Sequence, residues 1–117
     1  MGQLTTHVLD TRDGHPAAAM AFSLSRLEGD RWLPLRQGRT NADGRVDGPL
    51  LAGAELLAGQ YELLFEAGDY FRTQGVVLPE PAFLEQVVLR FGVADPAGHY
   101  HVPLLVSPWS YSTYRGS

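Results

Sequence analysis

The sequence predicts an all-β fold, a sandwich or barrel built as one domain. Thirteen glycines and eight prolines break the 117 residues into short segments. Between these breaks lie short runs rich in Leu, Val, Phe and Tyr, which are typical of strands joined by frequent turns. No fixed repeat and no low-complexity linker divides the chain. We therefore expect a single domain over residues 1–117.

Each expected strand ends at a cluster of turn-forming residues. In the first third of the chain, strands are expected at Gln3 to Asp10, Met20 to Leu27 and Trp32 to Arg39. The turns between them are Thr11 to Pro16 and Glu28 to Asp30. The first third of the chain is therefore predicted to form three strands joined by two turns.

The middle of the chain predicts a tight turn, two strands and a helix. In the turn Asn41 to Gly44, the glycine should take a positive φ, which glycine adopts at no steric cost. An irregular fourth strand and a fifth strand at Gln60 to Ala67 follow. Gly68 to Gln74 is long enough for one or two helical turns.

The last third predicts three strands. Phe83 to Val93 and His99 to Val106 should form a pair, joined by a hairpin turn at Asp95 to Gly98. Pro108 has no N–H to donate and should interrupt the pairing. The final strand should cover Tyr111 to Arg115.

Composition excludes several classes of function. The net charge is −4 and no Lys/Arg cluster occurs, which argues against nucleic-acid binding. No segment approaches the ~20 apolar residues of a membrane helix. The start, Met1 to Asp10, lacks the pattern of a signal peptide. The chain has no cysteine, so a disulfide framework and a thiolate zinc site are excluded. We expect a cytoplasmic protein without membrane contact.

Two of the four histidines stand in a His-x-His pair. His99 and His101 should lie on one face of a strand, about 6.6–7 Å apart. From spacing alone they are surface residues, metal ligands or acid–base groups. His7 shares a strand face with Thr5, and a histidine in mid-strand is more often structural than catalytic. His15 lies in a turn and is expected to be structural or exposed.

Arg45 directly follows the Asn41 to Gly44 turn, so a constrained backbone holds a guanidinium whose donor fork suits imides and enolates. The C-terminal Tyr111 to Ser117 is unusual for a chain end because it holds two tyrosines and an arginine. Taken alone, Arg45 is an ordinary surface residue and the tail an ordinary edge strand. No Ser-His-Asp order, Gly-x-Ser-x-Gly elbow or phosphate-binding glycine loop is evident.

Taken together, four segments resemble the 5-hydroxyisourate hydrolase family, and the resemblance covers the whole chain. The closing sequence from Tyr114 to Ser117 is the hallmark of that family. Trp109 differs from the family pattern by a conservative change, because members of the family often have another aromatic residue, Tyr or Phe, at this position. The four segments are Thr6 to Asp10, Thr40 to Arg45, His99 to Leu105 and Ser107 to Ser117.

The resemblance implies a transthyretin-like (prealbumin) two-sheet Greek-key β-sandwich with one short helix. It also implies a homotetramer, a dimer of dimers with active sites at the dimer–dimer interface. The related hormone carrier transthyretin shares the fold. The carrier lacks the set that stands here at His7, Arg45, His101 and Tyr114 to Ser117.

The activity implied is hydrolysis of 5-hydroxyisourate in urate degradation, without metal or cofactor. Opening of the six-membered ring at a C–N amide bond would give 2-oxo-4-hydroxy-4-carboxy-5-ureidoimidazoline. His7 and His101 would activate and orient the water, in an order that the sequence leaves open. Arg45 would hold the imide-like edge and Tyr114 would add a contact. The substrate-binding residues implied are His7, Arg45, Ser112, Tyr114, Arg115 and Ser117.

Two alternatives compete with a hydrolase. A non-catalytic transthyretin-like carrier would bind a small molecule without converting it. A structural or adhesion module would leave His7, Arg45 and His101 scattered and exposed. Convergence of these three side chains at one place would separate an enzyme from such a module.

Overall fold

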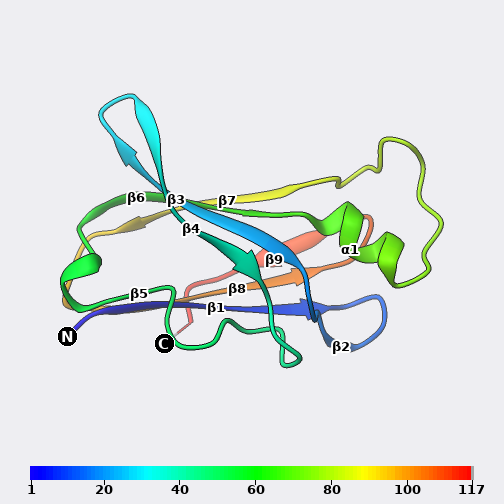
Figure 1. The fold of residues 1–117 in the computed structure, drawn as a ribbon, viewed down its shortest axis with the longest axis horizontal. Coiled ribbons are helices and arrows are strands. Elements are labelled where there is room, and N and C mark those ends of the chain that lie inside the picture. Colours follow the sequence, from blue (N-terminus) through cyan, green and yellow to red (C-terminus); the bar gives the residue numbers. More distant parts are fainter. Residues whose placement is uncertain (117) are drawn as a thin grey trace.

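The computed structural model describes residues 1–116, which form a sandwich of two β-sheets (Figure 1). The strand order is β2-β1-β8-β9 in the first sheet, with β5 pairing to β1, and β4-β3-β6-β7 in the second. The first sheet consists of β1 (Gln3–Asp10), β2 (His15–Pro16), β5 (Leu51–Ala52), β8 (His99–Val106) and β9 (Tyr111–Thr113). The second consists of β3 (Ala21–Glu28), β4 (Arg31–Arg39), β6 (Gly59–Phe65) and β7 (Val87–Val93).

The predicted two-sheet sandwich with one short helix is confirmed. The helix α1 (Ala67–Thr73) follows β6 and lies at one end of the sandwich (Figure 1). The irregular fourth strand is reduced to β5, which leads into a 3-10 turn, η1 (Gly53–Glu55). No helix within residues 1–116 is long and apolar enough to cross a membrane.

Alternation along the strands separates an inner face from an outer face in the first sheet. In β1, Leu4 and Val8 are fully buried against the second sheet, whereas Thr5 and His7 on the other parity are only half-buried. Each fully buried Leu or Phe contributes about 1.5–3 kcal/mol through burial of apolar surface. The largest fully buried side chains are Tyr61, Phe65, Phe71, Leu4, Met20 and Leu24.

One buried carboxylate ties α1 to the first sheet. Asp10, at the end of β1, is 1% exposed. It accepts hydrogen bonds from the Tyr70 hydroxyl at 2.8 Å and from the N–H groups of Arg12 and Asp13 at 3.0 Å each. A buried charge is tolerated only when it is bonded in this way. Asp10, the last residue of the segment Thr6 to Asp10, therefore has a structural role.

The predicted strand at Phe83 to Val93 is wrong in its first part, because β7 begins at Val87. The residues before it are bonded to α1 instead of a strand. The Glu85 carbonyl accepts the N–H of Gly68 at 2.9 Å, and its carboxylate pairs with Arg72. Hydrogen bonding to Arg72 lowers the pKa of Glu85 to about 2.

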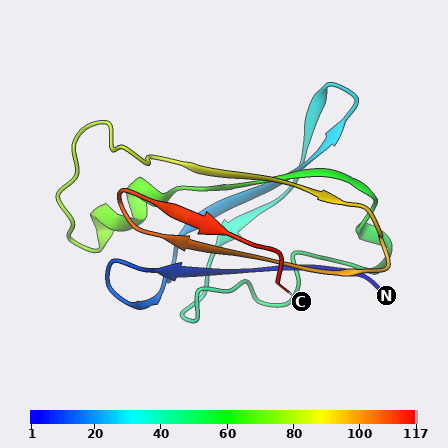
Figure 2. The ribbon, with the colours of Figure 1, turned by 180° about the vertical axis from the view of Figure 1, so that it is seen from behind.

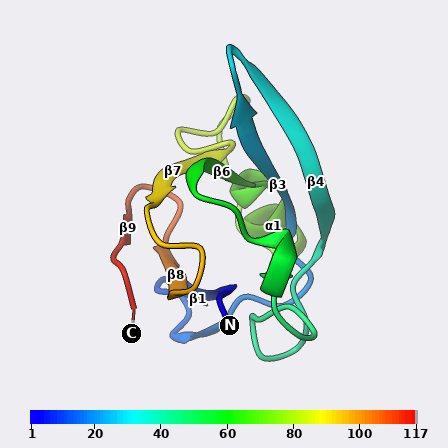
Figure 3. The same ribbon diagram turned by 90° about the vertical axis from the view of Figure 1, so that its left-hand side faces the viewer.

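The predicted hairpin at Asp95 to Gly98 is also wrong. The turn forms, with the Gly98 N–H donating to the Asp95 carbonyl at 3.0 Å. It joins β7 of one sheet to β8 of the other, so it crosses the sandwich (Figure 3). β7 pairs with β6, and β8 pairs with β1 and β9. The final predicted strand is shorter than expected and ends at Thr113.

Replacing Tyr70 by Phe removes one hydrogen bond from the buried carboxylate of Asp10. We expect the free energy of unfolding to fall by about 1–3 kcal/mol, the cost of leaving a buried polar group unsatisfied. Urea denaturation followed by circular dichroism measures this change. Tyr111→Phe, at a side chain that is 45% exposed, serves as the control. Equal stability of Tyr70→Phe and the unaltered protein would contradict the structural role of Asp10.

Candidate active site

Three neighbouring chain segments place polar side chains on the outer face of the first sheet. β1 and β8 run parallel, with Thr5 opposite His101 and His7 opposite Pro103. After β9, Gly116 forms an isolated bridge with His101. Thr5, His101 and Gly116 thus form one row across the sheet, and His7 lies in the next row. Figure 2 shows β9 and the chain end beside β8.

Arg45 reaches the same face from the loop that follows β4. Its backbone forms an isolated bridge with His7. The side chain of Asn41 closes the loop by accepting the N–H groups of Asp43 at 2.9 Å and Arg45 at 3.0 Å. The Asn41 N–H donates to the Arg45 carbonyl at 2.7 Å. These bonds fix the backbone from which the guanidinium extends.

Gly44 allows this loop to lie against β1. Its φ is +74°, as predicted for the turn. Its carbonyl accepts the Val8 N–H at 2.8 Å. A Cβ at this position would lie 2.4 Å from the Val8 carbonyl oxygen, which is far closer than packed atoms allow. A residue with a side chain here would push the loop, and Arg45 with it, away from His7.

His101 is held from both sides. The Thr5 hydroxyl lies 2.8 Å from its Nδ1 atom. On the other side, the Gly116 N–H donates to the His101 carbonyl at 2.7 Å. A Cβ on Gly116 would lie 2.6 Å from the His101 Cδ2 atom. Position 116 therefore requires glycine, because the His101 ring occupies the space that a side chain of residue 116 would need.

Burial and mutual repulsion keep both imidazoles neutral. Desolvation lowers the pKa of His7 below its ordinary value, and the positive charge of Arg45 lowers it further. Desolvation likewise lowers the pKa of His101, with added contributions from Arg45 and His7. Interactions between all three groups mean that they share one region. At neutral pH the site therefore offers two uncharged imidazoles beside one permanent cation.

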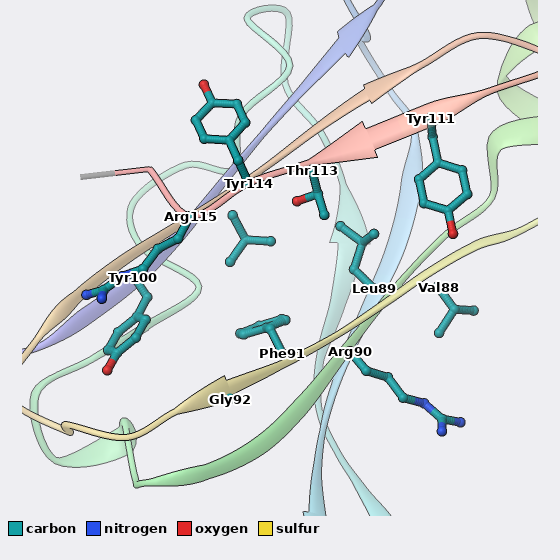
Figure 4. Close-up of a pocket in the computed structure, with 11 residues that line it drawn as sticks. Val88, Leu89, Arg90, Phe91, Gly92, Tyr100, Tyr111, Thr113, Tyr114 and Arg115 are labelled. Carbon is teal, nitrogen blue, oxygen red and sulfur yellow. The ribbon is translucent and has the colours of Figure 1, made fainter.

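Of the other predicted site residues, Ser112 lies on this outer face and Arg115 does not. Ser112 is opposite Leu105, which shares the parity of His101 on β8. The Arg115 guanidinium lies 4.2 Å from the centre of the Tyr100 ring, whose side chain is buried on the inner face (Figure 4). It donates to the His99 carbonyl at 3.2 Å. Arg115 thus anchors the chain end from the opposite side.

A cavity of about 400 Å³ opens between β7 and the chain end, beside Arg115 (Figure 4). Phe91, Tyr100 and Tyr114 are among its lining residues. The exposed ring of Tyr114 points away from Phe91 in Figure 4. The cavity contains none of the three residues that interact at the outer face. Ser117, the last predicted site residue, lies outside the described residues.

His99 makes a contact of its own, away from His101. Its Nε2 atom lies 3.0 Å from the Met1 carbonyl oxygen. Within residues 1–116, the side chains grouped closely enough to hold a metal are Asp10, Asp13 and His15, which contain neither histidine of the pair.

Thr5 is the residue that sequence reasoning did not identify as part of the site. Its position on the face of His7 is evident from alternation, but its contact with His101 depends on the pairing of β1 with β8. These two strands are separated by most of the chain. Nothing in the local sequence indicates which strands are neighbours.

Comparisons with known proteins place the chain among relatives of one family. Residues 4–116 match the model of the HIUase/Transthyretin family. The chain is 64% identical over 116 residues to the 5-hydroxyisourate hydrolase 2 of Rhizobium meliloti strain 1021, covering 99% of this chain and 97% of that protein. Both matches cover nearly the whole chain, and His7, Arg45 and His101 lie within the family match.

Solved structures share the same fold. An (S)-allantoin synthase superposes with a TM-score of 0.94 at 50% identity, over 99% of this chain but 44% of that chain. The 5-hydroxyisourate hydrolase of Klebsiella pneumoniae gives 0.81 at 37% identity and full coverage of both chains. The transthyretin of Sparus aurata gives 0.86 at 30% identity, over 97% and 96% of the two chains.

The lowered pKa values predict how the two histidines titrate. In proton NMR, we expect the ring protons of His7 and His101 to titrate below the ordinary histidine value of about 6.5. Arg45→Gln removes a repelling charge and should raise both midpoints. Arg31→Gln, at an exposed side chain on β4 of the other sheet, is the matched control.

The same shifts predict that stability falls in acid. Because the unfolded chain binds protons more readily, the free energy of unfolding should decrease as the pH drops below about 6.5. In the NMR titration, midpoints at or above 6.5 for His7 and His101, or midpoints that do not change in Arg45→Gln, would show that the three groups do not interact.

Proposed function

The chain belongs to the HIUase/Transthyretin family, and from that premise we propose that it hydrolyses 5-hydroxyisourate on the outer face of its first sheet. The observation that carries the proposal is the convergence of His7, Arg45 and His101 there, from three distant parts of the chain. The identity of 64% to a 5-hydroxyisourate hydrolase supports the same activity. In this proposal residues 1–117 act as a single hydrolase domain, located in the cytoplasm.

The reaction requires a base for water and fixed charge for the developing oxyanion. Water attacks a carbonyl carbon of the six-membered ring, and one neutral imidazole takes a proton from it. The carbonyl oxygen becomes negative, and in this proposal the Arg45 guanidinium stabilises that charge. When the C–N bond breaks, its electron pair goes to nitrogen, which takes a proton. The water molecule and the acid–base groups supply every proton that these steps need, and no cofactor is required.

The remaining predicted residues support the site in different ways. Ser112 shares the outer face and can contact the substrate. Tyr114 is exposed and stands two residues after Ser112, and in this proposal it contributes its hydroxyl or backbone. Arg115 acts indirectly, because its bond to the His99 carbonyl and its contact with Tyr100 hold the chain end. That anchor keeps Gly116 against the His101 ring.

A carrier function fits the observations less well. A carrier that binds an apolar or aromatic molecule gains nothing from two imidazoles and a guanidinium on the surface it uses. A purely structural module would not bring His7, Arg45 and His101 together. The closeness of the three groups therefore favours catalysis over both alternatives.

The proposed assembly is a homotetramer with its sites where two dimers meet. β7 and β9 each form one edge of their sheet, opposite the edges at β4 and β2, and they lie on the same side of the sandwich (Figure 3). Such edges readily pair with another copy. The outer face around His101 also carries Leu9 and Leu105, which are only half-buried within one chain. A second dimer placed over this face would cover them and close the site.

His101→Asn should reduce turnover of 5-hydroxyisourate by about 10²–10⁴-fold, the range for loss of an acid–base group, with loss of an oxyanion hydrogen-bond donor at the lower end of that range. The substrate is generated from urate in the cuvette, and its ultraviolet absorbance is followed with and without protein. His99→Asn is the matched control, since His99 is bonded to Met1 and should leave the rate nearly unchanged. Full activity in His101→Asn would remove this residue from the mechanism.

Light scattering tests the proposed assembly. We expect a mass close to four times the 12.8 kDa of one chain. Leu105→Glu introduces a charge on the outer face and should reduce that mass to a dimer. Leu57→Glu, at a side chain that is 47% exposed elsewhere, should leave it unchanged. A monomer at assay concentrations would rule out sites shared between dimers.

A further inference from the structure

We propose that Thr5 is a positioning residue whose hydroxyl fixes the proton of His101 on Nε2, so that His101 donates a hydrogen bond and His7 is the general base. The inference deepens the proposed function and rests on it. It assigns separate tasks to two histidines that the sequence leaves interchangeable. It also gives a chemical role to a threonine that belongs to no recognised catalytic motif.

The geometry leaves one nitrogen of His101 available to a substrate. Nδ1 lies 2.8 Å from the Thr5 hydroxyl oxygen, within the same row of the sheet. Gly116 covers the ring from the other side, where its own Cβ would meet Cδ2. The ring therefore cannot turn over without breaking the bond to Thr5. Within residues 1–116, Nε2 makes no hydrogen bond, so it is the nitrogen left for a substrate.

Counting hydrogens decides which tautomer this arrangement favours. A neutral imidazole has one N–H, and a threonine hydroxyl has one O–H. Within residues 1–116, Nδ1 is the only hydrogen-bond partner of the Thr5 hydroxyl. If Nδ1 carried the proton, the half-buried hydroxyl would have no acceptor within residues 1–116 and would depend on solvent for one. When the hydroxyl donates to Nδ1, both groups are satisfied and the imidazole proton resides on Nε2.

His7 is in the opposite situation. The Asp43 backbone acts to raise the pKa of His7, against the larger lowering effects of burial and Arg45. Within residues 1–116, no side-chain hydroxyl faces a ring nitrogen of His7 in the way that Thr5 faces His101. A neutral His7 ring therefore keeps one lone pair available as a base. Burial and the charge of Arg45 keep this ring unprotonated near neutral pH. His7 can accept a proton where His101 can only donate.

With His7 as the base and His101 as a hydrogen-bond donor, every proton in the reaction has a source and a destination. As the water oxygen bonds to the carbonyl carbon, His7 takes one water proton. The carbonyl oxygen becomes negative and accepts a hydrogen bond from the Nε2–H of His101, alongside Arg45. When the tetrahedral centre collapses, the C–N electron pair leaves on nitrogen, and the proton held by His7 neutralises it. His101 keeps its own proton throughout.

Thr5→Val tests the proposal because it keeps the shape of the side chain and removes the hydroxyl, while Thr5→Ser retains it. Nitrogen-15 NMR of the ring nitrogens reports the tautomer of His101 in each protein above its titration range. We expect an Nε2–H tautomer in the unaltered protein and in Thr5→Ser, and a mixture in Thr5→Val. An Nδ1–H tautomer in the unaltered protein would overturn the proposal without any variant being made.

Kinetics distinguishes positioning from general loss of structure. In Thr5→Val we expect kcat to fall about 10–10²-fold, less than for removal of an acid–base group, while KM changes little. Thr5→Ser should restore most of the rate. The acid limb of the pH–rate profile should be the same in Thr5→Val and the unaltered protein, because it belongs to His7. Full activity of Thr5→Val, or a shifted acid limb, would contradict the assignment.

The two proposals can fail separately. If the unaltered protein does not hydrolyse 5-hydroxyisourate, the proposed function fails, whatever the tautomer of His101. If it hydrolyses the substrate but His101 carries its proton on Nδ1, the function stands and the role of Thr5 is refuted. The same sample serves both measurements, so the comparison does not depend on differences between preparations.

Discussion

The parallel pairing of β1 with β8 is the constraint on which the site depends. It sets Thr5 beside His101 and places His7 one row further along the same face. Side chains alternate with a period of two along a strand. A slip of a single residue would therefore turn one imidazole into the core and separate it from the other. Thr6, on the inner parity, secures this register by donating its hydroxyl to the Val102 carbonyl at 2.7 Å.

Two glycines make the approach of distant segments to this pair possible. At Gly44 a positive φ and the lack of a Cβ let the loop bond to β1, which brings Arg45 beside His7. At Gly116 the lack of a Cβ makes room for the His101 ring. Both positions lie where backbone must approach another group closely. Two residues without a side chain thus help to position Arg45 and His101.

The sequence predicts much of this arrangement, because alternation is a local property. It places His7 and His101 on defined strand faces and predicts the turn that precedes Arg45. It does not reveal that β7 and β8 belong to different sheets, since the turn between them has the composition of a hairpin. The same alternation separates Arg115 from Ser112, but only the pairing of β9 with β8 shows which of the two faces the histidines. Contacts between strands far apart in sequence are decided by packing of the whole sandwich.

The most direct test of the account is a double-mutant cycle for turnover of 5-hydroxyisourate with His7→Asn, His101→Asn and the combined variant. If both imidazoles act on one substrate in the same step, the double variant should be about as slow as the slower single variant, because groups that act as a unit are strongly non-additive. If the two rate losses instead multiply, the histidines act independently. That outcome would contradict a shared site on the outer face of the first sheet.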